Sequence, residues 1–148
     1  MEFNRHISRR LHEEHDATLA LWGRVEGTVA AGKSDPALLK SAAAALAHEL
    51  DVHFEFEEKQ LFPRLAACGE ADIGELLAEE HVAIRAAGQR FMELVRSDPG
   101  AAELRPLALE LAERLFSHVQ KEEMSLLPML EDLVDEAADG ELTAAYAS

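Results

Sequence analysis

Two stretches of the chain share the pattern that decides the fold: residues 53–63 read HFEFEEKQLFP, and residues 118–128 read HVQKEEMSLLP. At an offset of 65 (118 minus 53), a histidine, two adjacent glutamates, a leucine and a proline coincide. Positions i and i+4 share one face of an α-helix, so each stretch points one imidazole and one carboxylate to the same side. The pattern therefore predicts two helices, each with a His-x-x-x-Glu pair.

A second repeated motif precedes each of these helices. Glu13-Glu14-His15 recurs as Glu79-Glu80-His81, at an offset of 66 (81 minus 15). Together the two motifs select six side chains from 7 histidines and 29 acidic residues, namely His15, His53, Glu57, His81, His118 and Glu122. The other histidines have no counterpart and are interpreted as solvated helix residues: His6, His12 and His48.

The whole chain has the outline of a helical bundle. Apolar residues recur at helical spacing in four segments, separated by short Gly, Pro, Ser and Asp clusters. The first three lie at about 7–31, 36–67 and 72–96, and the fourth begins between residues 101 and 106 and ends near 138. Aromatic residues make up only 5% of the chain, and alanine and leucine, which favour helices, supply most of the apolar content. Because short connections join antiparallel neighbours, we predict an all-α, up-down-up-down antiparallel four-helix bundle with an internal pseudo-twofold repeat. One domain spans residues 1–148 with a core of about 7–138, and the acidic tail after Glu131 is expected to be partly solvated.

Each His-x-x-x-Glu pair lies on an apolar stripe and is therefore expected to face the bundle interior. The stripes consist of leucines: Leu46, Leu50, Leu61, Leu111, Leu115 and Leu126. Glu58 and Glu123 are rotated by about 140° from their histidines and should face elsewhere. Burying two carboxylates and four imidazoles without a counter-charge would cost many kcal/mol, and a bound cation removes that cost.

The residue types restrict the metal. A single cysteine, Cys68, cannot build a thiolate site, so nitrogen and oxygen ligands must hold any ion. Two ligand sets suit two ions bridged by Glu57 and Glu122, each ion also taking two histidines. This mixture favours iron, and manganese and zinc are compatible on ligand type.

Other motifs have structural interpretations. Residues 27–34 match the phosphate-binding pattern G-x-x-x-x-G-K-S, but an amphipathic helix precedes them, so Gly32 is interpreted as a helix C-cap. Pro63 and Pro128 should kink or end their helices just past the ligands. Trp22 and Phe56 either wall the metal site or simply pack in the core.

From His15 through Pro128 the sequence resembles the hemerythrin-like HHE cation-binding family, whose pattern is a histidine followed by His-x-x-x-Glu, repeated once. The resemblance implies a four-helix bundle with a non-haem di-iron centre. It makes four histidines terminal ligands and two glutamates bridges: His15, His53, His81, His118, Glu57 and Glu122.

The sequence departs from oxygen-carrying hemerythrins, which have a fifth histidine one turn from the ligand on the third helix. Leu77 and Arg85 occupy the candidate positions, so reversible oxygen transport is not expected. Carboxylates beside the ligands are candidates to complete the site: Glu14, Glu58, Glu80 and Glu123. The favoured function is a di-iron protein that reacts with or senses O2, NO or H2O2. The alternatives are iron binding without redox turnover, in storage, buffering or an iron-responsive switch, and an interaction bundle without metal.

Charge and hydropathy exclude other classes. A net charge of −15 opposes binding to nucleic acid and to anionic membrane surfaces. No stretch approaches the roughly 18 apolar residues of a membrane span, and residues 1–6 lack the apolar region of a signal peptide. A cytoplasmic location is therefore expected.

Overall fold

The computed structural model describes residues 2–147, and every regular element in that range is a helix. The prediction of an all-α protein is confirmed. The first two long rods are α1 (His6–Ala30) and a continuous run of α2 (Pro36–His48), the π-helical segments η1 (Glu49–Phe54) and η2 (Glu57–Leu61), and α3 (Phe62–Ala67). The other two are α4 (Ala71–Ser97) and a run of α5 (Leu104–Lys121), the π-helical η3 (Glu122–Leu126) and α6 (Leu127–Leu133). A further helix, α7 (Glu136–Ala147), follows.

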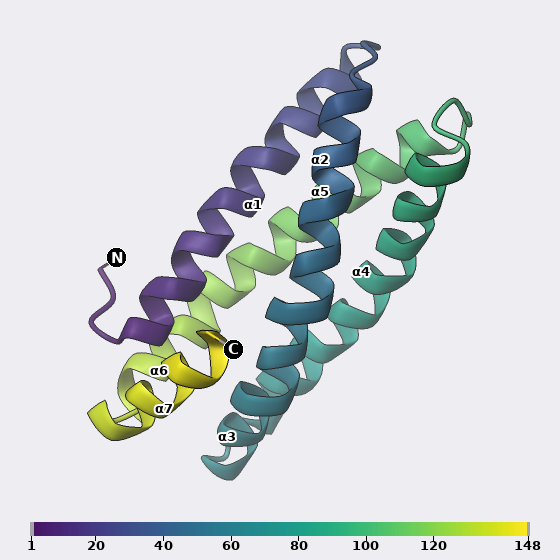
Figure 1. Ribbon diagram of the computed structural model, residues 1–148. Helices are drawn as coiled ribbons and strands as arrows, with labels where there is room; N and C mark the ends of the chain where they lie inside the picture. Colours follow the sequence, from purple (N-terminus) through teal and green to yellow (C-terminus); the bar gives the residue numbers. More distant parts are fainter. Residues whose placement is uncertain (1, 148) are drawn as a thin grey trace.

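The four rods lie side by side (Figure 1). Helix α1 contacts α2 and α5, and α4 contacts the same two helices from the other side. Helix α7 lies against α1 at the end of the bundle that holds the N-terminus. Among residues 2–147, no helix combines the length and apolarity that crossing a bilayer requires.

Local sequence signals set the helix ends. The carboxylate of Asp35 accepts a hydrogen bond from the amide of Leu38 at 3.1 Å, and Pro36 occupies the first helical position of α2. Gly32, with φ of 72°, follows the end of α1 in the left-handed region that glycine adopts without strain. The interpretation of Gly32 as part of a helix terminus is confirmed, and residues 27–34 follow a helix rather than the strand that a phosphate loop needs.

The two prolines after the ligands neither end nor simply kink their helices. Pro63 and Pro128 lie at the starts of α3 and α6, each directly after a π-helical segment that begins at a ligand glutamate. Proline lacks an amide hydrogen and its ring clashes with the carbonyl of residue i−4. A wider π turn accommodates both effects, and such turns are frequent at functional sites.

The C-terminal tail is the main departure from the predicted four-helix arrangement. The fourth rod ends at Leu133 rather than near 138, and Val134 adopts an extended conformation before α7 folds back onto α1. The carboxylate of Asp135 caps α7 by accepting from the amide of Ala138 at 2.8 Å. Leu142 and Tyr146 are buried whereas Glu136 and Glu141 are exposed, so the tail is partly solvated as expected, although it forms a helix that packs against α1.

Helix α7 also caps the start of α1. The N-cap residue of α1, Arg5, makes no capping hydrogen bond with its own side chain. Instead, the buried carboxylate of Asp139 accepts hydrogen bonds from the amides of His6 and Ile7, both at 2.9 Å. Glu131 accepts from the neighbouring amides of Asn4 and Arg5.

We expect Asp139→Ala to lower the free energy of unfolding by about 1–2 kcal/mol, the range for loss of a helix N-cap. Asp132 is an exposed acid on α6 without a polar contact in the described structure, so Asp132→Ala is the matched control and should change stability by less than about 0.5 kcal/mol. Urea unfolding of the two variants measures the difference. Equal stabilities would contradict capping by Asp139.

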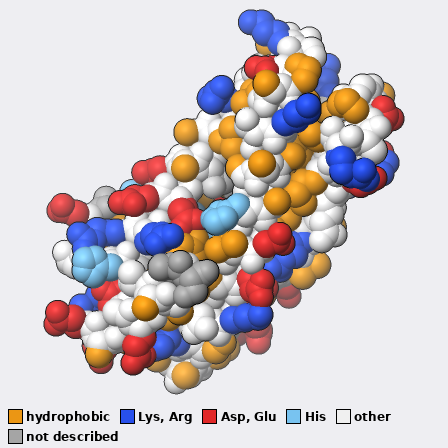
Figure 2. Space-filling view, viewed as in Figure 1, with side chains coloured by type: hydrophobic (Ala, Val, Ile, Leu, Met, Phe, Trp, Pro, Cys, Tyr) orange, Lys and Arg blue, Asp and Glu red, His pale blue; other side chains and the backbone are white. Residues whose placement is uncertain are grey.

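Two apolar clusters fill the bundle, one on each side of the histidine layer. The first contains Trp22, Leu46, Leu50, Leu111 and Leu115. The second contains Leu11, Leu61, Leu77 and Leu126. The predicted leucine stripes are buried as expected. Hydrophobic side chains also gather on the surface toward the end of α2 that lies opposite α7, whereas charged side chains dominate around α7 (Figure 2).

Candidate metal centre

All six residues selected by the sequence repeat meet in one buried layer of the bundle. Their exposed fractions are 0–2%. They come from all four rods: His15 from α1, His53 and Glu57 from η1 and η2, His81 from α4, and His118 and Glu122 from α5 and η3. The Nε2 atom of every histidine points toward the two carboxylates.

The distances divide the layer into two groups that share both carboxylates. In one group, Nε2 of His15 lies 2.8 Å from Oε1 of Glu122, and Nε2 of His53 lies 3.1 Å from Oε2 of Glu57. In the other, Nε2 of His118 lies 3.1 Å from Oε2 of Glu122, and Nε2 of His81 lies 3.1 Å from Oε1 of Glu57. Each glutamate thus presents one oxygen to each histidine pair. Within each group, one ligand atom from every residue lies within 4.8 Å of the others.

A second ring of carboxylates surrounds the histidines and faces their outer nitrogens. Nδ1 of His15 lies 2.7 Å from Glu123, Nδ1 of His81 lies 2.6 Å from Glu58, and Nδ1 of His118 lies 2.8 Å from Glu80. Nδ1 of His53 faces Glu14 at 3.6 Å. The repeat relates these contacts in pairs. The contact of His15 with Glu123 corresponds to that of His81 with Glu58, and the contact of His53 with Glu14 corresponds to that of His118 with Glu80.

The sequence analysis named these four carboxylates as candidates to complete the inner site, whereas the structure places them at the outer nitrogens of the histidines. The prediction from helical spacing that Glu58 and Glu123 lie outside the inner layer is correct. They do not point away from the site, however, because each contacts a histidine on a neighbouring rod. The sequence does carry a signal, since all four motifs contain two adjacent glutamates. Both glutamates of each His-x-x-x-Glu motif take part in the site, and in the other two motifs the second glutamate, Glu14 or Glu80, takes part. Their partners could not be inferred because they lie on other helices.

Basic side chains also pair with the outer carboxylates. Arg85 binds Glu58 at 2.5 Å, so it neither enters the inner layer nor is free in solvent. Lys121 forms an ion pair with Glu80. Nδ1 of His12 lies 2.5 Å from Glu123, so the interpretation of His12 as a solvated residue is wrong. His6 and His48 are exposed as expected.

The corner around His53 differs from the other three. The hydroxyl of Tyr146, on α7, donates to Oε1 of Glu14 at 2.5 Å. A second carboxylate, Glu49, lies 3.6 Å from Nδ1 of His53, and that nitrogen makes no hydrogen bond within residues 2–147. This corner therefore carries two acids beside one histidine.

A phenylalanine that the sequence analysis did not single out walls the centre. The ring of Phe54 stacks on His81, with centroids 3.7 Å apart and an interplanar angle of 4°, and lies 5.3 Å from His118. Trp22 packs against Phe91 in the apolar core, and Phe56 packs against Tyr146. Of the two interpretations left open for Trp22 and Phe56, core packing is the one observed.

The electrostatics of the layer favour charged imidazoles when no metal is bound. Burial lowers the pKa of His15, but hydrogen bonds to Glu122 and Glu123 outweigh burial and raise this pKa to about 9. Burial also lowers the pKa of His118, but the contacts with Glu122 and Glu80 outweigh burial and raise this pKa to about 10. Burial raises the pKa of Glu122, but His118 and His15 hold it well below its ordinary value. Burial raises the pKa of Glu49.

We expect the metal-free protein to lose stability as the pH rises above neutrality. Because the pKa values of His15 and His118 are raised above 6.5, their contribution is complete below about pH 6.5 and is lost as the pH passes 9 and 10. Urea unfolding between pH 6.5 and 10 measures this slope. His118→Gln should flatten it, whereas a wild-type stability that rises over this range would contradict the assignment.

The residues present fit a metal site. Oε1 of Glu57 and Oε2 of Glu122 are fully buried but make no hydrogen bond, although imidazole nitrogens lie 3.1 Å away. The Nε2 atoms of His81 and His118 also face each other at 3.1 Å. Unsatisfied buried oxygens and converging imidazole nitrogens are the donor set that divalent transition metals bind.

Fold and site together define a helical bundle with a buried histidine–carboxylate cluster that could hold metal ions. Comparison with protein families gives a match over residues 6–130 to hemerythrin, the hemerythrin HHE cation binding domain. The chain therefore belongs to the hemerythrin HHE cation-binding family. No curated protein sequence matches it. Helix α7, with Tyr146, lies beyond the matched residues.

Proposed function

We propose that this protein binds two iron ions in the buried layer and that the loaded centre reacts with O2, NO or H2O2. One observation carries the proposal: Glu57 and Glu122 each turn one oxygen toward the His15–His53 pair and the other toward the His81–His118 pair. Glu57 and Glu122 would hold the ions together with the four histidines; this mixture of carboxylates and imidazoles suits iron, and manganese and zinc satisfy the same ligand types.

Iron, when bound, supplies one-electron redox chemistry toward small oxidants. The protein supplies orientation, charge and exclusion of water. The outer carboxylates fix the Nδ1 proton and the ring orientation of His15, His81 and His118, which leaves Nε2 as the ligand atom. Phe54 and the flanking leucine clusters keep the layer apolar on both sides.

The side chains at the two candidate positions for a fifth histidine favour reaction over reversible carriage. Leu77 is buried and has no donor atom, and the guanidinium of Arg85 is held by Glu58 and the carbonyl of Leu50. The inner layer therefore offers four imidazoles rather than five.

The test exposes anaerobic di-ferrous protein to oxygen and then purges it with argon. We expect oxidation that argon does not reverse, followed through the visible spectrum. A spectrum that returns to that of the di-ferrous protein would favour oxygen carriage. A di-ferrous protein inert to O2, NO and H2O2 would contradict the redox proposal and favour iron storage or buffering.

A further inference from the structure

Helix α7 covers the His53 corner of the metal layer from outside the four rods. The ring of Tyr146 meets the ring of His53 edge to face, with centroids 6.3 Å apart and an interplanar angle of 89°. The same ring packs on Phe56 at 4.6 Å and 74°, and its hydroxyl donates to Glu14 at 2.5 Å. The side chain of Tyr146, which is buried, therefore lies over a ligand histidine and holds the outer carboxylate beside it.

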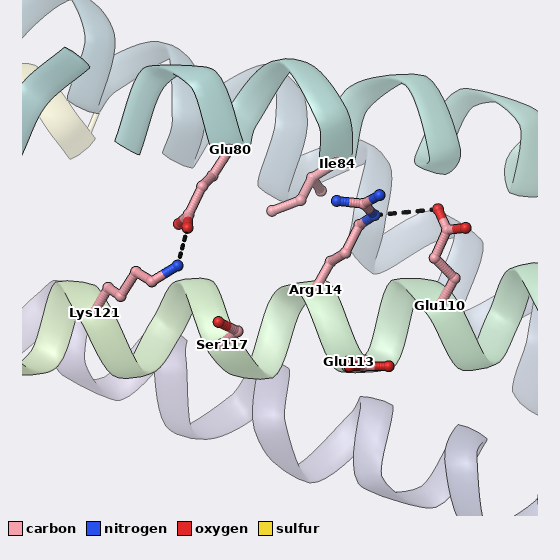
Figure 3. Close-up of a pocket in the computed structure, with 7 residues that line it drawn as sticks. All are labelled: Glu80, Ile84, Glu110, Glu113, Arg114, Ser117 and Lys121. Atoms are coloured by element: carbon pink, nitrogen blue, oxygen red, sulfur yellow. Dashed lines mark hydrogen bonds and ion pairs between the residues drawn. The ribbon is translucent and has the colours of Figure 1, made fainter. Parts of the chain in front are cut away.

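The internal repeat shows what takes this place in the other half of the chain. Glu14 corresponds to Glu80 (14 plus 66), and Phe56 corresponds to Lys121 (56 plus 65). Figure 3 shows Lys121 reaching Glu80 across the cavity between α4 and α5, so a side chain of the neighbouring rod holds this carboxylate. Phe56 has no group that could bind Glu14, and the hydroxyl of Tyr146 does so instead. The first half of the chain therefore depends on α7 for a contact that the second half makes within the bundle.

The other outer carboxylates are likewise held by the rods themselves. Arg85 on α4 binds Glu58, and His12 on α1 contacts Glu123. Opening those corners requires the rods to separate, whereas opening the His53 corner requires only that α7 moves.

Two cavities flank the His53 corner. One has a volume of about 370 Å³ and is lined in part by Arg10, Glu14 and Glu49. The other has a volume of about 320 Å³ and is lined in part by Phe56 and Tyr146. The hydrogen bond between Tyr146 and Glu14 joins the lining of one cavity to the lining of the other. Movement of this ring would connect the two cavities over the histidine.

The attachment of α7 is local. Val134, extended and buried, joins this helix of 12 residues to the fourth rod. Helices shorter than about 12–15 residues are marginal in isolation, so α7 depends on docking through Asp139, Leu142 and Tyr146. Segments docked by few side chains open at a lower free energy than the whole domain unfolds. Helix α7 can therefore detach while the four rods stay packed.

We propose that α7 is a lid on the His53 corner, held shut by Tyr146, and that iron enters and leaves the buried centre when this lid opens. The proposal rests on the proposed metal-binding function. Arg10 supports the closed form, since its guanidinium lies 4.7 Å from the centroid of the Tyr146 ring and 3.6 Å from Glu14. The lid lies beyond the residues that match the family, so it is a feature of this chain added to the common bundle.

The first test follows iron(II) as it passes, without oxygen, from the loaded full-length protein to excess of a colour-forming ferrous chelator. Because opening of the lid limits release, the wild-type rate should become independent of chelator concentration. Tyr146→Ala should release iron at least about tenfold faster, from the same two-iron starting content, since loss of a buried ring favours the open lid. Tyr146→Phe keeps the packing on Phe56 and loses only the bond to Glu14, so its rate should lie between the two.

The control separates the lid from general stability. Leu104 is buried in the apolar cluster on the other side of the metal layer. Leu104→Ala should lower the melting temperature but release iron at the wild-type rate.

Amide hydrogen exchange of the metal-free protein tests the lid without iron. The amides of α7 should exchange faster than those in the middle of the four rods, and Tyr146→Ala should speed exchange in α7 alone. Exchange in α7 as slow as in the rods, or release of iron from Tyr146→Ala at the wild-type rate, would overturn the lid and leave the centre intact. A wild-type protein that retains no iron after desalting would overturn the proposed function, and with it the passage of iron through the lid.

Discussion

Replacing Glu122 with alanine should abolish stable binding of both metal ions, because this carboxylate presents an oxygen to each histidine pair. Its neighbour provides a matched comparison. Glu123 contacts only the outer nitrogens of His15 and His12, so Glu123→Ala should weaken binding by the roughly 10- to 100-fold typical of an outer partner. The loss in Glu122→Ala should exceed that range.

The measurement is metal content after anaerobic iron loading and desalting. Glu57→Ala and Glu58→Ala form the equivalent pair in the first half of the chain, and should show the same order. Circular dichroism establishes that each variant remains helical. Equal losses at Glu122 and Glu123 would show that the inner and outer carboxylates are assigned wrongly.

Metal removal should lower the melting temperature by roughly 10 °C or more. An ion that binds only the folded chain, present at 1,000 times its Kd, adds about 4 kcal/mol. One kcal/mol corresponds to about 2–4 °C for a protein of this size. The ion also relieves the buried oxygens of Glu57 and Glu122 that lack hydrogen bonds.

Thermal unfolding with a chelator and with excess metal gives this difference. Glu122→Ala should show almost no response to metal, which controls for nonspecific binding to the acidic surface. A wild-type melting temperature that does not change on chelation would contradict a buried site.

The inner layer could be predicted because each His-x-x-x-Glu pair is close in sequence and the pair occurs twice in the chain. His53 and Glu57 share a face by helical spacing alone, and the copy at His118 and Glu122 distinguishes them from surrounding acids. The apolar stripe beside each pair predicts burial, which the structure shows.

The outer contacts were not predictable because they depend on how rods pack. Glu58 reaches His81 and Glu123 reaches His15 only once separate helices are aligned. Helix α7 was missed because its sequence is acidic and contains Gly140, although Asp135 at its N-cap was a usable signal. The burial of Tyr146 against Glu14 follows from that packing.

The most direct test of a di-iron centre is the iron content of the anaerobically reconstituted, desalted protein. The account predicts two irons per chain. One iron or none per chain would contradict it.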